Sequence, residues 1–558
     1  MNQIFGYQIL PEDASSNHFV FDETKLVSPS ANFDSRPGQV QIFAQSNSHF
    51  QCCFSQKYRA YSYVWGIPAH PDISTSDIPK WCANAVVERR YGRFRELIGT
   101  FVVIIDEPEQ NRITFVTDIL GVRPMFHGKH NGRIVFGSNV WSIQRAGLTK
   151  GEIDYDAVSA WISYGYNCTD GTIFSDLRRL PPGSAVVLQD GQYTQFPYVA
   201  FESKSQAPEI EQVSEEVHHI VSSTIKPLLA NHPRIIFSLS GGYDSRYLLA
   251  LSLSLGKTSV ECATVSYTEE EGHVAHQVAE ILGVPLKTHN INGSIWNLYD
   301  KVYHFTADGF PISKFVTYCV AQQYPEIPMV NGFMGDSLMR GSKDTFLGKY
   351  ETEWGCDLAE VLQRKHLFAN FKLFRREVVE RIQMRSRIPM EKAAQKGASI
   401  GKVFGWADFY YRQRFYISNN FLQHIEITET LLPFYSWKLL AYKMEHDYKL
   451  FNRDIYHVIF LTHFPQLAKI PHASDLPTKK YHHFGVAKCT NQWSRELFPI
   501  ICNKEWLSLL RKKLCIPLDL AGIAGLRRAE SSIFLLERLY LLEKRMRDVG
   551  LDFDWECI

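Results

Sequence analysis

Residues 234–250 read RIIFSLSGGYDSRYLLA. The segment opens with a short apolar run rich in β-branched and aromatic side chains. A turn of small residues follows at 240–242, and helix-forming leucines resume at 247–255. This order predicts a strand, a loop and a helix, and the rest of the second half of the chain is interpreted around it.

The loop has the composition of a phosphate cradle. Between a buried strand and a helix N-terminus, it can direct several backbone N–H groups and the helix dipole at one anion. Gly241 and Gly242 let the backbone approach the anion without a Cβ atom, while Ser240 and Ser245 add hydroxyl donors. Asp244 would repel a phosphate unless a cation lay between them, so we interpret it as a Mg²⁺ ligand. The alternative is a tight strand-to-helix turn that happens to be rich in serine and glycine.

The hexapeptide SGGYDS, residues 240–245, resembles the pyrophosphate-binding loop S-G-G-x-D-S of the N-type ATP pyrophosphatases. It is not a G-x-x-x-x-G-K-[ST] loop. Members of that family cleave ATP to AMP and pyrophosphate, so the resemblance implies ATP and Mg²⁺ as cofactors. It also implies that Ser240, Gly241, Gly242 and Ser245 hold the pyrophosphate.

The segments after the loop predict a parallel sheet. Residues 260–266 form an apolar strand, residues 269–282 a helix, and a further strand begins at residue 285. Strands separated by helices pair in parallel, and ligands of such sheets lie beyond the carboxyl ends of the strands. Leu239 and Val265 lie at two of these ends, where we expect them to contact the adenine.

A second loop at residues 328–341, PMVNGFMGDSLMRG, again leads from an apolar strand to an aspartate, Asp336. Taken alone, Asp336 is better explained as a helix N-cap. Beside the first loop we predict that it binds Mg²⁺ together with Asp244, because two carboxylates at neighbouring strand ends can converge on a triphosphate.

This second loop resembles S-G-x-G-x-D-E-x-x-x-G of the synthetase domain of asparagine synthetases. Gly332, Asp336 and Gly341 match; Asn331 stands for the serine, Met334 for the second glycine and Ser337 for the glutamate. Phe333 occupies a variable catalytic position that holds glutamate, tyrosine or histidine in relatives. Phenylalanine neither hydrogen-bonds nor moves a proton, which argues against asparagine as the product. The residues assigned to ATP or pyrophosphate are Leu239, Ser240, Gly241, Gly242, Asp244, Ser245, Val265, Asn331 and Gly332.

The N-terminal half shows short strand-like segments and turns over residues 41–198. Its segments G-x-F-x-x-x-x-D (99–106), D-x-x-G-V-R-P-x-F (118–126) and L-P-P-G (180–183) resemble the glutaminase domain of class II glutamine amidotransferases. That family's nucleophile is a cysteine directly after the initiator methionine, where this chain has Asn2. Residues 64–69 read VWGIPA in place of the glutamine-holding Asn-Gly-Glu segment. We therefore expect a fold retained without glutaminase activity.

Length and composition set the remaining limits. A chain of 558 residues exceeds one core, and the polar segment 201–208 predicts a linker, so we expect domains at 1–205 and 206–558. The net charge of +1 gives no reason to expect nucleic acid or an anionic membrane as partner. The N-terminus lacks signal-peptide features, and no run is apolar enough for a membrane span, so we expect a cytoplasmic protein. Eleven cysteines without metal spacing argue against a zinc site.

Three later segments complete the prediction. Residues 411–435 resemble a segment reading roughly G-V-E-x-R-x-P-F-L-D in the family, residues 452–469 predict a packed helix, and residues 527–549 predict an amphipathic helix. Lys479 and Lys480 fall where the family has a catalytic lysine that neutralises charge on the leaving phosphate. The spacing does not decide which lysine serves, and a solvated surface pair is the alternative.

The combined resemblance is to the asparagine synthetase superfamily. It implies an α/β protein: an Ntn-hydrolase-like αββα sandwich, then a parallel-sheet ATP pyrophosphatase domain with a helical C-terminal part. It also implies an AMP-forming carbon–nitrogen ligase that activates a small-molecule or peptide carboxylate as an acyl-adenylate, which ammonia or an amine then attacks. A homodimer stays open. The alternatives are an ammonia-independent macrocyclase or β-lactam synthetase-like cyclase, and a catalytically decayed binding scaffold. Sulfur transfer or tRNA modification lacks the necessary cysteines and basic surface.

Overall fold

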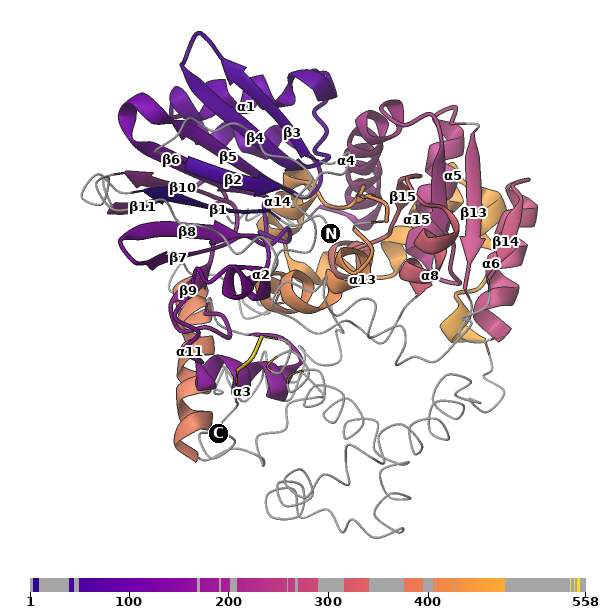
Figure 1. The fold of residues 1–558 in the computed structure, drawn as a ribbon. Coiled ribbons are helices and arrows are strands. Elements are labelled where there is room, and N and C mark those ends of the chain that lie inside the picture. Colours follow the sequence, from indigo (N-terminus) through magenta and orange to yellow (C-terminus); the bar gives the residue numbers. More distant parts are fainter. Residues whose placement is uncertain are drawn as a thin grey trace.

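The computed structural model describes a defined part of the chain. The described residues are 4–9, 40–44, 50–167, 171–189, 192–200, 208–257, 259–265, 269–289, 316–340, 376–394, 405–406, 408–425, 427–476, 542, 546 and 549–551. Figure 1 shows two lobes, the N-terminal half in indigo and purple and the C-terminal half in magenta and orange. Asn2, Lys479 and Lys480, the linker at 201–207 and most of the predicted tail helix lie outside the described residues.

The N-terminal half contains two stacked antiparallel sheets. One has the strand order β11-β10-β6-β5-β4-β3, and the other the order β2-β1-β8-β7-β9. Side chains from both sheets share an apolar layer, in which the rings of Phe115 and Phe136 lie 5.0 Å apart, edge to face. The strands are β1 (Ile4–Ile9), β2 (Val40–Ala44), β3 (Phe50–Ser55), β4 (Ala60–Gly66), β5 (Phe101–Glu107), β6 (Arg112–Thr117), β7 (Phe126–His130), β8 (Arg133–Gly137), β9 (Leu177–Arg179), β10 (Ser184–Gln189) and β11 (Gln192–Pro197).

Helices cover the outer faces of these sheets. The α-helices are α1 (Ile78–Val87), α2 (Val140–Arg145) and α3 (Tyr155–Tyr164), and the 3₁₀ turns are η3 (Thr75–Asp77), η4 (Tyr91–Glu96) and η5 (Pro108–Gln110). The helix α1 packs on the six-stranded sheet, and α2 packs on the other (Figure 1). The sequence pattern of strands and turns did not predict these helices. Two of these helices nevertheless begin after residue types that favour the N-cap position. Asn139 and Asp154 each accept a backbone N–H bond at the start of α2 and α3.

The C-terminal half is built on one parallel sheet of order β14-β13-β12-β15-β16, which confirms the predicted sheet type. Its strands are β12 (Ile235–Ser238), β13 (Val260–Thr264), β14 (Leu286–Thr288), β15 (Met329–Val330) and β16 (Thr430–Leu431). Helix α4 (Ile210–Ala230) precedes the first strand of this sheet, and its Val213 and Val217 side chains are fully buried. Between the strands lie α5 (Tyr243–Ser254), α6 (Glu269–Ile281), α8 (Val316–Gln323) and the π-helix η6 (Asp336–Arg340).

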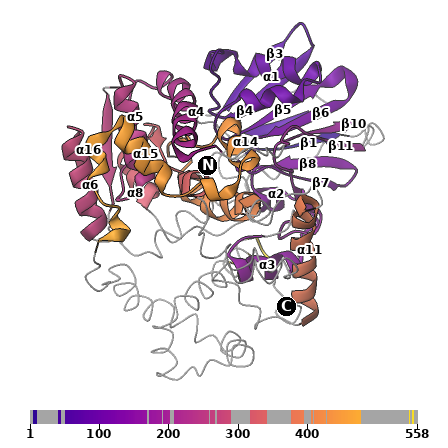
Figure 2. The same cartoon turned by 180° about the vertical axis from the view of Figure 1, so that it is seen from behind.

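The remaining described helices pack around this sheet and towards the N-terminal half. They are α11 (Arg376–Ala394), the π-helix η8 (Asp408–Ile417), α13 (Asn419–Leu422), α14 (Trp437–Glu445), η9 (Tyr448–Leu450), α15 (Asp454–His463), α16 (Pro465–Ala468) and η10 (Ala473–Asp475). The helix predicted at 452–469 is thus two helices, divided at Phe464. In both views α4 and α14 lie between the two halves (Figures 1 and 2).

The two halves share one apolar core. The largest cluster of buried side chains runs from strand β4 of the N-terminal half to the segment after α16. The predicted domain boundary at residues 205 and 206 stays a prediction, because it lies outside the described residues. None of the described helices is both long and apolar enough to cross a membrane.

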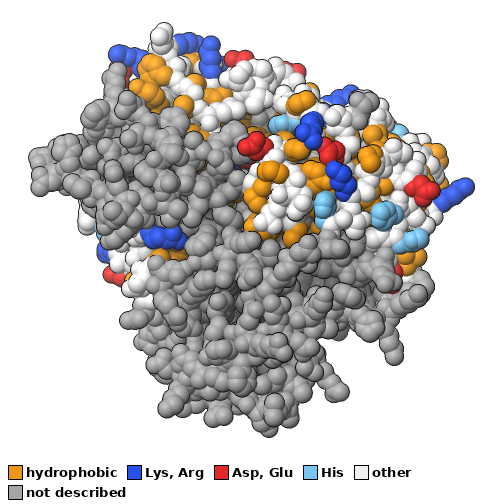
Figure 3. Space-filling model, turned by 45° about the vertical axis from the view of Figure 1, so that its right-hand side comes forward, with side chains coloured by type: hydrophobic (Ala, Val, Ile, Leu, Met, Phe, Trp, Pro, Cys, Tyr) orange, Lys and Arg blue, Asp and Glu red, His pale blue; other side chains and the backbone are white. Residues whose placement is uncertain are grey.

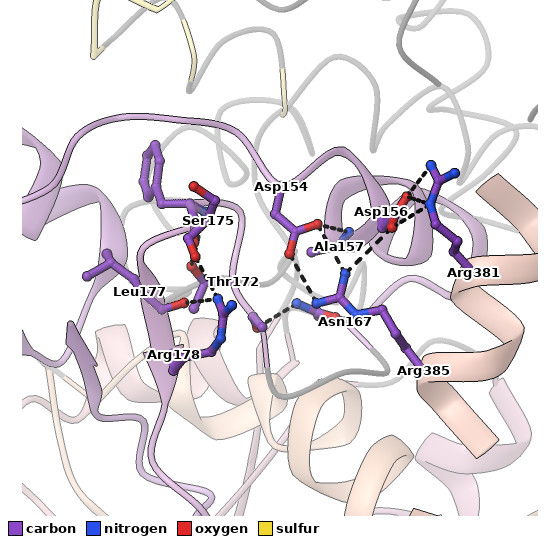
Figure 4. A network of polar contacts seen from close by, with 12 residues as sticks. Asp154, Asp156, Ala157, Asn167, Thr172, Ser175, Leu177, Arg178, Arg381 and Arg385 are labelled. Carbon is purple, nitrogen blue, oxygen red and sulfur yellow. Dashed lines mark hydrogen bonds and ion pairs between the residues drawn. The ribbon is translucent and has the colours of Figure 1, made fainter. Parts of the chain in front are cut away.

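Among the polar contacts that join the halves, ion pairs occur at two places. In the first, the fully buried Arg123 pairs with Glu429, which directly precedes β16, at 2.9 Å. In the second, α11 lies along α3, where Arg381 binds Asp156 at 2.8 Å and Arg385 binds Asp154 at 3.1 Å (Figure 4). The N-terminal half therefore contacts the C-terminal half both at the sheet and at this outer helix.

Candidate active site

The predicted site residues that the structure describes lie at the carboxyl edge of the parallel sheet. Strand β12 is central, with β13 on one side and β15 on the other. The loop 239–242 follows β12, Val265 follows β13, and the loop 331–335 follows β15. The structure thus brings together three segments that are far apart in sequence.

The conformation of the first loop is stabilised by hydrogen bonds to the hydroxyl groups of Ser240 and Ser245. The Ser240 N–H donates to Ser245 Oγ at 3.1 Å, the two Oγ atoms lie 3.1 Å apart, and the Gly242 N–H donates to Ser240 Oγ at 3.2 Å. Ser240 is exposed, whereas Ser245 is buried behind it. Helix α5 begins at Tyr243, four residues earlier than the leucine pattern indicated, so Asp244 lies in its first turn. The exposed Ser240 and the helix N-terminus therefore form the accessible surface of the loop.

Arg246 links the first loop to residues 470 and 471 through hydrogen bonds to backbone carbonyl groups. This fully buried guanidinium donates to the carbonyl oxygens of Gly242 (3.1 Å), Gly241 (3.0 Å), Ile470 (2.9 Å) and Pro471 (3.0 Å). Burial lowers the pKa of Arg246 from its ordinary value to about 10, so it stays charged at neutral pH. In a planar trans peptide the C=O and the next N–H point in opposite directions. The N–H groups of Gly242 and Tyr243 are therefore directed away from Arg246, and the Gly242 N–H donates to Ser240 Oγ.

The second loop packs directly against Asp244. A Cβ atom at Gly332 would lie 2.8 Å from Asp244 Cβ, and one at Gly335 would lie 2.5 Å from Asp244 Cγ. Glycine is needed at both positions because any side chain would push the two loops apart. Gly335 was not predicted as a site residue. The adjacent Met334, which stands for a family glycine, adopts a left-handed φ of 68°, so the chain keeps a glycine-like conformation there.

Two carboxylates lie near this junction. Asp244 is half-buried and Asp336 is exposed at the start of η6. The hydroxyl of Tyr456, on α15, donates to Asp244 Oδ1. Burial raises the pKa of Tyr456 well above 10, and the negative charges of Asp244 and Asp336 raise it further. Tyr456 thus lies near both carboxylates, although the sequence indicated only a packing residue on an amphipathic helix.

The donor set fits a magnesium ion bound together with phosphates. Asp244 and Asp336 supply the hard oxygen ligands that Mg²⁺ prefers. Within the described ranges, no group of three or more His, Cys, Asp or Glu side chains forms a metal site made by protein alone. Mg²⁺ commonly completes its octahedron with water and substrate phosphates, and Ser240 with the α5 N-terminus lies next to these carboxylates.

The predicted adenine contacts are only partly accessible. Leu239 and Val265 reach the sheet edge, but their side chains are 2% and 5% exposed. The Leu239 N–H is already bonded to the Ala263 carbonyl at 2.9 Å. Asn331 and Gly332 are half-buried at the same edge. Contact between adenine and these residues stays a prediction.

The two family substitutions of the second loop have structural explanations. Phe333 is buried, with its ring 5.0 Å from Phe421 and 5.9 Å from Tyr435, so it fills the core. Ser337, in place of a glutamate, is buried and donates to Asp408 Oδ2 at 3.0 Å, while Gln413 donates to Ser337 Oγ at 2.6 Å. The carboxylate of Asp408, on η8, thus lies beside the position at which Ser337 replaces the glutamate of the family.

Charge on the outer surface is mixed. On the side that Figure 3 brings forward, basic and acidic side chains alternate with histidines and hydrophobic groups, without a large area of one sign among the described residues. This agrees with the net charge of +1.

Comparison with known proteins shows which proteins this chain is similar to. Residues 84–199 match the family model of the glutamine amidotransferase domain. The chain is 23% identical over 180 residues to asparagine synthetase [glutamine-hydrolyzing] 3 of Bacillus subtilis (strain 168), covering 31% of this chain and 29% of that protein. It is 23% identical over 273 residues to a probable asparagine synthetase [glutamine-hydrolyzing] of Acanthamoeba polyphaga mimivirus, covering 47% of this chain and 46% of that protein. The chain is thus similar to proteins of the asparagine synthetase superfamily.

The match to this superfamily spans less than half of each curated relative. Solved structures that align with the chain include a glutamine phosphoribosylpyrophosphate amidotransferase from B. subtilis, at 12% identity and TM-score 0.21, covering 53% of this chain and 61% of that one. Another is an NH₃-dependent NAD synthetase from Campylobacter jejuni, at 13% identity and TM-score 0.18, covering 34% of this chain and 97% of that one. The sheets and helices of this chain, rather than these low scores, define its fold.

Proposed function

We propose that this protein is an ATP-dependent ligase that forms an amide bond through an acyl-adenylate. A substrate carboxylate attacks the α-phosphorus of ATP and releases pyrophosphate, and a nitrogen nucleophile then displaces AMP. One observation carries the proposal: the SGGYDS loop and the carboxylates of Asp244 and Asp336 meet at the carboxyl edge of one parallel sheet. Ligands of open α/β sheets bind at such an edge.

The residues of this edge have distinct roles in the proposed reaction. The hydroxyl of Ser240 and the N–H groups that start α5 would bind the pyrophosphate group and stabilise the negative charge that develops as it leaves. Asp244 and Asp336 would hold Mg²⁺, which supplies positive charge to the phosphate oxygens. Tyr456 keeps the Asp244 carboxylate oriented through its hydroxyl bond.

The nitrogen source follows from the N-terminal half. Asn2 takes the place of the nucleophilic cysteine, and VWGIPA takes the place of the glutamine-holding segment. The absence of glutaminase activity is therefore part of this proposal. The nitrogen then comes from free ammonia, from a partner that delivers ammonia, or from an amine on the substrate. A cyclase acting on its own substrate amine is the second candidate, favoured by the burial of Phe333 at the position where relatives carry a polar residue.

The test is ATP–pyrophosphate exchange by the purified chain with Mg²⁺ and pools of small-molecule and peptide carboxylates, aspartate included. Asp244→Asn keeps the size of the side chain but removes the charge that holds the metal. Asp72→Asn, at an exposed site in the N-terminal half, makes the same chemical change as a matched control. We expect exchange in the wild type and in Asp72→Asn, and its loss in Asp244→Asn.

The exchange result also decides between an enzyme and a decayed scaffold. Absence of both exchange and Mg·ATP binding in the wild type would contradict the ligase and favour a binding scaffold. Exchange that survives Asp244→Asn would contradict the assigned metal site. Dividing an active pool identifies the carboxylate, and adding ammonia or amines to the active mixture identifies the nucleophile.

A further inference from the structure

The segment 470–473 packs against the loop that is proposed to bind pyrophosphate. The Arg246 guanidinium joins the carbonyls of Ile470 and Pro471 to those of Gly241 and Gly242. The N–H of Ala473 donates to the Gly241 carbonyl at 3.1 Å. The backbone on both sides of His472 is therefore fixed to the loop.

The imidazole of His472 is also held in one orientation. The Ser474 N–H donates to His472 Nδ1 at 3.2 Å, and the Ser474 hydroxyl lies 2.8 Å from the same atom. The ring meets the Tyr243 ring edge to face at 4.8 Å. Because a backbone N–H can only donate, Nδ1 must accept, and the neutral ring then carries its proton on Nε2.

The Nε2 atom of this ring faces the anion loop. A Cβ atom built at Gly242, the N-cap residue of α5, would lie 3.8 Å from this Nε2 atom, so this edge of the ring lies beside the loop. A fixed N–H donor thus lies beside Gly242, the residue that caps the N-terminus of α5. Donors held in place before a ligand arrives lose little freedom when they bind it.

We propose that His472 is a pyrophosphate-binding residue, whose Nε2–H donates to a phosphate oxygen of the nucleotide or of released pyrophosphate. This proposal rests on the function proposed above and adds a donor from outside the SGGYDS motif. The competing explanation is that His472 only caps the short helix η10 through Nδ1.

Two substitutions separate these roles. In His472→Asn, the amide oxygen replaces Nδ1 and keeps the acceptor for the Ser474 N–H, but the distal donor is lost. In His472→Gln, the amide nitrogen replaces Nε2 and keeps the distal donor, but the cap is lost. The measurement is calorimetric titration of each full-length protein with magnesium pyrophosphate, together with its melting temperature.

We expect His472→Asn to weaken pyrophosphate binding by about 10- to 100-fold, the range for a hydrogen bond to a charged group. Its melting temperature should be unchanged, and His472→Gln should bind several-fold more tightly than His472→Asn. Wild-type affinity in His472→Asn, or equal losses in both variants, would overturn the proposal and indicate a cap only. With Asp244→Asn measured in parallel, failure of the wild type itself to bind magnesium pyrophosphate would overturn this proposal and the ligase site together.

Discussion

The motif residues of the two halves have opposite environments. In the N-terminal half, Asp118 and Arg123 of the D-x-x-G-V-R-P-x-F motif are 0% and 1% exposed. Asp118 accepts the N–H groups of Val122 and Arg123 and the hydroxyl of Tyr435, which lies in the C-terminal half. In the C-terminal half, Ser240 and Asp336 face solvent at the sheet edge.

This difference indicates what each motif does in this chain. A buried carboxylate or guanidinium is stable only when its partners are complete, so the N-terminal motif residues hold a turn and a contact between the halves. The exposed motif residues of the C-terminal half can exchange water for a ligand at little cost. The same kind of sequence signal thus marks a structural joint in one half and a candidate ligand site in the other.

The largest expected effect is a loss of stability when the buried ion pair between the two halves, Arg123 with Glu429, is broken. Arg123→Met removes one member of the buried pair with Glu429, in which both side chains are at most 2% exposed. The unpaired carboxylate should lower the free energy of unfolding by about 3–5 kcal/mol, measured by urea denaturation. The matched control is Arg93→Met, whose pair with Glu96 is at the surface and 3.5 Å long; its cost should be within about 1 kcal/mol.

A double variant, Arg123→Met with Glu429→Leu, sharpens this result. Replacing both charges by apolar groups should recover most of the loss, because no charge then stays buried and unpaired. Equal destabilisation by Arg123→Met and Arg93→Met would show that Arg123 is not a joint between the halves.

The second effect is a pH dependence of the N-terminal half. Asp106 on β5 is 3% exposed, and burial, with a smaller contribution from Glu107, raises its pKa from 3.8 to about 7. The folded state therefore holds a proton that the unfolded state releases above pH 4. The stabilisation is complete below pH 3.8 and is lost as the pH rises through 7, by at most about 4 kcal/mol.

Melting temperatures measured between pH 4.5 and 8 check this prediction. Asp106→Asn keeps a neutral side chain at every pH and should flatten the profile and raise the melting temperature at pH 8. Asp72→Asn, which is exposed, should leave the profile of the wild type. An unchanged slope in Asp106→Asn would assign the pH dependence to other groups.

The third effect concerns the exposed carboxylate of the ligand edge. Asp336→Asn should weaken binding of magnesium pyrophosphate by about 10- to 100-fold, because an amide is a poor substitute for a charged magnesium ligand. Its free energy of unfolding should change by no more than about 0.5 kcal/mol, as for other surface sites. A large loss of stability with intact binding would instead assign Asp336 to the structure of η6.

The smallest effect tests the glycine-like conformation of Met334. At φ 68°, Met334→Gly should be about 1 kcal/mol more stable than Met334→Ala, since both remove the buried side chain and only glycine tolerates this backbone freely. The same pair of substitutions at Met329, in strand β15, should give the opposite order. Alanine more stable than glycine at both positions would contradict the strain at residue 334.

The sequence predicted some elements of the structure more accurately than others. Strand β12 and its loop were located to within one residue, because an apolar run and two glycines restrict the backbone locally. Helices α1 to α3 were missed because their apolar residues lie among strand-like segments, and only tertiary packing on the two sheets selects the helix there. Gly335 was missed because its need arises from Asp244, 91 residues earlier in the chain, rather than from its neighbours.

The sequence by itself determined the alternation of strands and helices that makes the C-terminal sheet parallel and the position of the SGGYDS loop, since strand, turn and helix preferences act over a few residues. Only the tertiary structure decided the roles of Tyr456, Arg246 and His472. Tyr456 reaches Asp244, and Arg246 reaches the segment before His472, across more than 200 residues. Such contacts depend on how distant helices pack on the sheet, which no local pattern encodes.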